Sequence, residues 1–179
     1  MFNLFRKKEP TTKVFDKVWM NESSKQKALL EEWKKNKNVL LVFWFDETLQ
    51  AFEIELAKET TEAAKLFTAR EVSSAHIGNN PLIFAEHYPL AEKENTLFKK
   101  LGLKEATVWS ALNEPLFQLF GGERIIELMK KLGMKEEESI EHNMISKSIH
   151  NAQEKIAAKV NIEQSARSQK DWFQKNMPA

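Results

Sequence analysis

The chain has 179 residues, of which 42% are hydrophobic and 30% charged, a balance that excludes a wholly disordered chain and allows one domain with a sizeable core. Its 27 basic and 26 acidic side chains leave a formal net charge of +1, which argues against capture of nucleic acid by charge alone. Because there is no cysteine, disulfides, thiolate zinc ligands and cysteine nucleophiles are excluded, and we expect a cytoplasmic protein.

Residues 1–12 are predicted to be a flexible tail. Apolar residues at its start are followed by three basic ones, Arg6, Lys7 and Lys8. This pattern allows weak peripheral contact with an anionic membrane, although a solvated terminus is the favoured interpretation. No apolar run approaches the ~20 residues of a membrane-spanning helix, so no integral membrane segment is expected.

Two strands and two helices are predicted in the first third of the chain. Residues 13–20 favour a strand, and Asn21 then caps a helix that continues to about Asn36. Residues 39–45 are seven consecutive apolar residues, which is typical of a strand buried on both faces. Asp46 and Glu47 follow at once and place negative charge on the first turn of the next helix.

The middle of the chain continues the alternation of strands and helices. Residues 59–80 are ambiguous, with a short strand near 66–68 and a loop at 73–80. The later predicted elements are a strand at 81–86, a helix from Pro89 to Gly102, a strand at 106–112, a helix capped by Asn113, and a helix that Gly133 ends. Such alternation predicts an α/β fold, with a mostly parallel sheet and helices on both faces.

One long C-terminal helix is predicted from about Glu141 to Gln174. Its apolar stripe of Ile145, Ile149, Ala152 and Ile156 either packs on the sheet or binds a partner, and packing is favoured for this first half. The polar second half, with Trp172 near its end, either projects or lies across a partner. We therefore divide the chain into a tail (1–12), an α/β domain (13–139) and a helical C-terminal part (140–179).

Motifs for cofactor chemistry are missing from the sequence. None of the five glycines forms a phosphate loop, and the four histidines show no i, i+4 pair for zinc. No cofactor and no metal are therefore expected. Asp46, Glu86 and His87 lie near strand ends, where α/β folds place ligands, but helix capping and a polar strand end explain them more simply.

A resemblance to SecA-type preprotein translocases rests on the later part of the sequence. Residues 113–134, with the Phe120-Gly121-Gly122 break, look like the segment that closes the second motor domain of that family. Residues 140–155 resemble the start of its long scaffold helix. The likeness is strong over 113–155 and weaker upstream, and it implies a helicase-type, RecA-like fold.

The departures from the family concern its catalytic groups. The first motor domain, with its phosphate loop, has no counterpart in this sequence, and the loop near 68–80 lacks the family's Gly-Arg-Gly-Thr-Asp-like motif. Positions that resemble the family's γ-phosphate-sensing arginines hold Lys100 and Leu103, which cannot supply a guanidinium fork. The elements that resemble the family are its structural ones, and the departures fall on its catalytic groups. Together they predict a scaffold that lacks catalysis.

These observations predict a non-catalytic, SecA-like domain that acts as a protein-interaction or regulatory module connected to protein export. The expected partner is a protein, with no nucleic acid. The residues predicted to contact it are Phe98, Lys100, Leu103, Ile145, Ile149, Ile156 and Trp172. The alternative is a small-molecule or nucleotide-binding domain that uses Asp46, Glu86 and His87.

Overall fold

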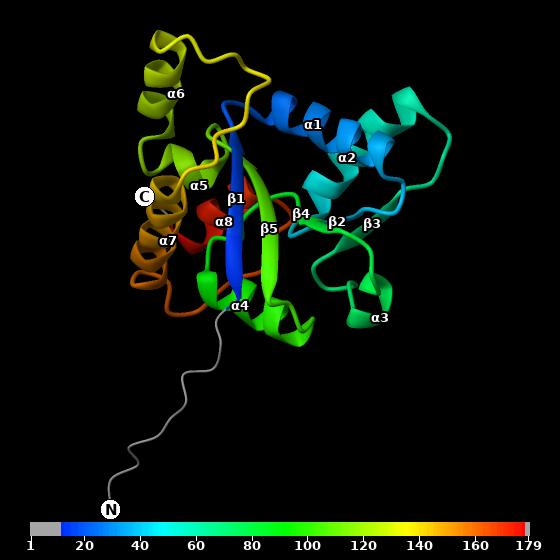
Figure 1. Cartoon of the computed structure of the whole chain (residues 1–179). Helices are drawn as coiled ribbons and strands as arrows, with labels where there is room; N and C mark the ends of the chain where they lie inside the picture. Colours follow the sequence, from blue (N-terminus) through cyan, green and yellow to red (C-terminus); the bar gives the residue numbers. More distant parts are fainter. Residues whose placement is uncertain (1–11, 178–179) are drawn as a thin grey trace, which may run out of the picture.

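A computed structural model describes residues 12–177 as an α/β domain built on one parallel sheet (Figure 1). The strands are β1 (Lys13–Trp19), β2 (Leu40–Phe43), β3 (Lys65–Thr68), β4 (Leu82–Phe84) and β5 (Glu105–Ala111). The helices are α1 (Glu22–Lys35), α2 (Asp46–Glu59), α3 (Ser74–Ile77), α4 (Ala91–Lys100), α5 (Pro115–Gln118), α6 (Gly122–Lys131), α7 (Asn143–Ala157) and α8 (Gln169–Asn176). The tail predicted for residues 1–12 lies outside the described residues, apart from Thr12.

The five strands follow the order β1-β5-β4-β2-β3, and every pair of neighbours is parallel. All four side chains of β2 are buried, as its unbroken apolar sequence predicts. The first strand pairs with the last, in register from Lys13 opposite Glu105 to Trp19 opposite Ala111. The predicted fold class is therefore confirmed, and the arrangement is consistent with the RecA-like type.

Helices cover both faces of the sheet. On one face, α1 and α2 bury Leu29, Trp33 and Phe52 against the strands. On the other face, α4 buries Leu97 and Phe98. Each helix turns its apolar stripe to the sheet, which is how amphipathic helices contribute to the core of an α/β domain.

A third cluster of buried side chains lies at the carboxyl ends of the strands. Here α5, α7 and α8 pack around Phe45 and Leu112, with Ile149, Ile156 and Trp172 among the buried residues. α7 also contacts β1 and α4, so the C-terminal part forms one body with the sheet. Within residues 12–177, no helix is long and apolar enough to cross a membrane.

The prediction of a single long helix from Glu141 to Gln174 is wrong. α7 ends at Ala157, and α8 begins at Gln169. The physical reason is that the apolar stripe of α7 ends at Ile156, while Trp172 must return to the same buried cluster. The Ser168 side chain then caps α8 by accepting a hydrogen bond from the Asp171 amide.

Two local predictions also need correction. The loop predicted at 73–80 contains the one-turn helix α3, which begins where Ser73 and the His76 ring form a reciprocal capping pair. Asn113 does not cap α5, because Glu114 occupies that position. The Asn113 side chain instead accepts a hydrogen bond from the Glu22 amide, at 2.9 Å, and thereby joins the end of β5 to the start of α1.

Candidate functional site

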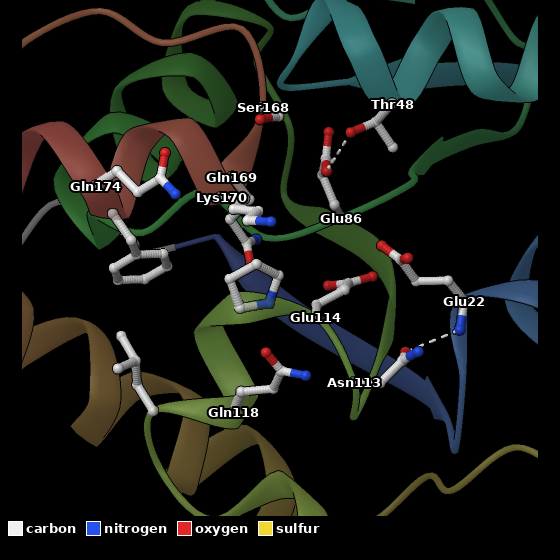
Figure 2. Close-up of a pocket in the computed structure, with 13 residues that line it drawn as sticks. Glu22, Thr48, Glu86, Asn113, Glu114, Gln118, Ser168, Gln169, Lys170 and Gln174 are labelled. Carbon is white, nitrogen blue, oxygen red and sulfur yellow. Dashed lines mark hydrogen bonds between the residues drawn. The ribbon is translucent and has the colours of Figure 1, made fainter.

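A cavity of about 560 Å³ opens at the carboxyl ends of the strands (Figure 2). Its walls come from the segments that follow four strands and from the C-terminal helix α8. The lining residues are Glu22, Thr48, Glu86, Asn113, Glu114, Pro115, Gln118, Leu119, Ser168, Gln169, Lys170, Phe173 and Gln174. This is the edge at which α/β folds bind their ligands. Ten of the thirteen lining residues are polar, and Pro115, Leu119 and Phe173 add apolar surface.

A buried ion pair lies behind the wall of the cavity. Lys25, on α1, donates to the Glu114 carboxylate at 2.5 Å and to the Ala85 carbonyl at 2.8 Å. Burial lowers the pKa of the Lys25 ammonium, but the negative charges of Glu114 and Glu86 outweigh that effect and raise it. Lys25 therefore stays charged and joins the segments after β4 and β5.

Glu86 follows β4, and its carboxylate accepts hydrogen bonds from the segment that joins β2 to the first turn of α2. One carboxylate oxygen accepts from the Trp44 and Phe45 amides at 3.0 and 3.1 Å, and the other accepts from the Thr48 hydroxyl at 2.9 Å. Burial raises the pKa of Glu86 to about 7, against the opposing charge of Lys25. This carboxyl group therefore changes its charge near neutral pH.

His87 forms a second buried charged network on the other side of β4. Its ring donates to Asp16 at 2.8 Å and to Glu94 at 2.9 Å, and Gln153 of α7 donates to the second oxygen of Glu94. Burial lowers the pKa of the imidazole, but the carboxylates of Glu94 and Asp16 raise it to about 10. A positively charged His87 thus links β1, α4 and α7.

The three residues predicted for a ligand do not share one site. Glu86 lines the cavity in Figure 2, whereas His87 lines a different cavity, between β1, α4 and α7. Asp46 lines neither and forms a salt bridge with Arg70 at 2.6 Å. Of the three, only Glu86 has the position that ligand binding in the strand-end cavity requires.

Most of the side chains predicted to bind a partner are inside the molecule. Phe98, Ile149, Ile156 and Trp172 are at most 3% exposed and form part of the core. A partner cannot reach them in this fold, because α4, α7 and α8 turn them inward. The stripe on α7 therefore packs on its own domain.

The other three predicted partner residues are at least partly accessible. Lys100 is exposed at the end of α4. Leu103 is half-buried against the core beneath α4, and Ile145 is half-buried against the cluster at the strand ends. Together the seven predicted residues do not form one continuous surface.

The sequence analysis missed two of the groups that define the strand-end cavity. Lys25 looks like one of several surface lysines of α1, and it pairs with Glu114, 89 positions away. Glu114 stands directly after the last strand, within the segment 113–134 that carries the family resemblance. Its position directly after a strand could have pointed to it, but its pairing with Lys25 of α1 depends on how distant segments pack.

A second feature of the surface is the amphipathic helix α6. Its only buried residue is Gly122, while Ile125 and Met129 are half-buried and Leu128 and Leu132 are 52% and 71% exposed. We call these four apolar side chains the α6 surface. In Figure 1, α6 stands at the edge of the molecule, away from the sheet.

Comparison with known proteins gives a partial relation to SecA. The chain is 45% identical over 49 residues to the protein translocase subunit SecA of Acinetobacter baumannii, and 51% identical over 49 residues to that of Acidithiobacillus ferrooxidans. Each match covers 27% of this chain and 5% of the relative, so the chain spans a small fraction of the length of these proteins. No protein-family model matches the chain. The expected likeness to SecA is confirmed for this stretch.

Proposed function

We propose that this chain is a non-catalytic, SecA-like domain that binds another protein in a process connected to protein export. The observation that carries the proposal is the α6 surface. Ile125 packs against the cluster at the strand ends, but Leu128, and Leu132 directly after the helix, remain in water. This outer part of the apolar stripe gains little stability within the chain. Exposed apolar side chains grouped on one helix are typical of protein contacts.

The connection to export is supported by the 49-residue similarity to proteins named protein translocase subunit SecA. The proposed lack of catalysis is supported by the side chains at the positions where the resemblance would place nucleotide-contacting arginines. Lys100 is a single flexible cation, and Leu103 is packed against the core. Neither offers the planar pair of donors that stabilises a transferring phosphoryl group.

A photo-activated crosslinking residue placed at Leu132 tests the partner directly, in cells that produce the protein naturally. We expect one discrete protein adduct, identified as a component of the export machinery. The matched control is the same crosslinker at Ile54, an apolar residue that is 60% exposed on α2. Adducts of equal yield at both positions, or none at Leu132, would refute the α6 surface as the contact.

The lack of catalysis is tested by ATP turnover of the purified chain. We expect turnover no higher than that of a heat-unfolded sample, both alone and after addition of the crosslinked partner. A steady release of phosphate that depends on the folded chain would contradict the proposal.

Ligand binding at the strand ends is the second candidate function, and the cavity of about 560 Å³ favours it. Its lining includes the carboxylates of Glu22, Glu86 and Glu114, which repel phosphate groups. We therefore expect ATP, ADP and GTP at about millimolar concentration to leave the melting temperature unchanged.

A further inference from the structure

Two basic side chains border the exposed part of the α6 surface. With 3.6 residues per turn, Arg124 and Lys131 lie about 40° and about 60° from Leu128, on the same side of it around the helix axis. The acidic side chains Glu123 and Glu127 lie about 140° and about 100° from Leu128. Both cations are exposed, and neither forms an ion pair among residues 12–177. The apolar side chains are therefore bordered by positive charge that the described part of the chain does not compensate.

An apolar cavity adjoins the α6 surface. Ile125 of α6 lines it together with Phe120 and with Ile145 and Ile149 of α7, and its volume is about 50 Å³. In Figure 1, α5, α6 and α7 lie along one edge of the molecule. Lys155 Nζ is 5.8 Å from the centre of the Phe120 ring and adds a third cation. The cavity is far below the roughly 300–1,000 Å³ of small-molecule sites, but the end of one apolar side chain can enter it.

The spacing of the α6 surface suits a second helix. Its four side chains stand at i, i+3, i+4 and i+7, so they extend over about 10 Å along the axis. Ridges with this spacing fit between the side chains of another helix. The surface and the cavity beside it contain no strand residue, whereas addition of an extended peptide requires the edge of a sheet. The shape thus favours a helical partner.

Charge disfavours a second copy of this chain as that partner. In a symmetric contact between two antiparallel α6 helices, each side of one helix lies beside the same side of the other. The basic side chains of the two copies would then meet, and like charges repel. A helix with acidic side chains at the same places would instead form ion pairs with Arg124 and Lys131.

We propose that the partner presents to the α6 surface an amphipathic helix whose apolar stripe is bordered by aspartate or glutamate. The stripe packs on the α6 surface, one of its apolar side chains enters the cavity beside Ile125, and its carboxylates lie against Arg124 and Lys131. This rests on the proposed function and deepens it, because it names the kind of partner that the same surface binds.

Fluorescence anisotropy of the full chain with a labelled synthetic helix of about 18 residues tests the proposal. The probe has leucine at i, i+4, i+7 and i+11 and glutamate beside this stripe, and the matched control peptide has lysine in place of each glutamate. We expect saturable binding of the acidic peptide, and binding of the basic peptide that is at least about tenfold weaker. The affinity for the acidic peptide should fall between about 50 and about 500 mM salt, because the charge pairs lie at the surface.

Charge reversal assigns the binding to the α6 surface. Arg124→Glu combined with Lys131→Glu should invert the preference, so that the basic peptide binds more tightly than the acidic one. The charge-matched control is Lys130→Glu combined with Lys27→Glu, at exposed positions about 160° from Leu128 on α6 and on α1, and it should keep the parent's preference. Leu128→Asp should weaken binding of the acidic peptide at least about tenfold. All these positions are exposed, and circular dichroism checks that each variant is folded.

Three results would overturn the proposal. One is no binding of the acidic peptide by the folded chain, or equal binding of both peptides. The second is a dimer, detected by light scattering, that Leu128→Asp dissociates, because a second copy would then cover the surface. The third is binding to phosphatidylglycerol vesicles that the reversal of Arg124 and Lys131 abolishes, because the basic side chains would then serve a lipid surface.

The crosslinker at Leu132 separates this proposal from the proposed function. We expect the reversal of Arg124 and Lys131 to lower the yield of the adduct in cells at least about fivefold. An adduct whose yield the reversal leaves unchanged would keep the α6 surface as the contact and refute an acidic helix as the partner. No adduct at Leu132 would refute the proposed function itself, whatever the peptides show.

Discussion

The buried network around His87 allows a quantitative prediction for the stability of the chain. In His87→Leu, the carboxylates of Asp16 and Glu94 lose the cation that lies 2.8 and 2.9 Å from them, while both stay buried. Removing one member of a buried ion pair typically costs about 3–5 kcal/mol, because an uncompensated charge remains in the interior. We expect a loss of about that size in the free energy of unfolding near neutral pH.

The pH dependence of the parent chain gives an independent measure of the same network. The folded pKa of His87, about 10, lies above its ordinary value of 6.5, so between these values the folded state binds more protons than the unfolded state. Stability from this group is therefore complete below about pH 6.5 and is lost as the pH rises toward 10. Between about pH 7.5 and about pH 9 the free energy of unfolding should fall by about 2 kcal/mol.

Urea unfolding followed by tryptophan fluorescence measures both effects, since the chain has five tryptophans. His87→Leu should be less stable at neutral pH and should lose most of the slope between pH 7.5 and 9. The control is His150→Leu, at an exposed histidine of α7 that pairs with Glu154, and its stability should change by at most about 0.5 kcal/mol. A cost below about 1 kcal/mol for His87→Leu, or an unchanged slope, would refute a charged His87.

Two further predictions concern packing at the carboxyl end of the sheet. Gly122→Ala should destabilise the chain by about 1–3 kcal/mol, because the new Cβ would lie 2.3 Å from the Leu112 carbonyl oxygen. Gly102→Ala, where the Cβ meets nothing within 4 Å and the cost is the positive φ of 71°, should lose less in the same urea titration. Trp172→Ala should cost about 3–5 kcal/mol, because this fully buried ring anchors α8, and near-ultraviolet circular dichroism should show the loss of its packing. Gln174→Ala, at an exposed position of the same helix, is expected to match the parent chain, and an equal loss in both variants would contradict the anchoring role.

The fold could be predicted from local patterns, because each of its elements carries its own signal. The apolar run at 39–45 contains β2, and the Asp46-Glu47 pair begins α2 as expected. The alternation of strands and helices was sufficient to predict a parallel sheet. What local patterns do not encode is which strands become neighbours, such as β1 beside β5.

The candidate site was less predictable, because its chemistry depends on residues far apart in the sequence. Glu86 was singled out by its position after a strand, and it does line the cavity. Lys25 meets Glu114 only after β1, β4 and β5 have assembled. The break between α7 and α8 depends likewise on Trp172 returning to a core that the helical pattern alone does not reveal.

The pairing of the first strand with the last has a consequence for how the chain is made. During synthesis β1 leaves the ribosome before β2 to β5, but its neighbour β5 is complete only when residue 111 has been added. Until then the backbone groups of β1 that later pair with β5 lack their partners, a state in which nascent chains are prone to mispairing. The wall of the strand-end cavity is completed later still, since Gln169 and Phe173 belong to α8, the last helix within residues 12–177.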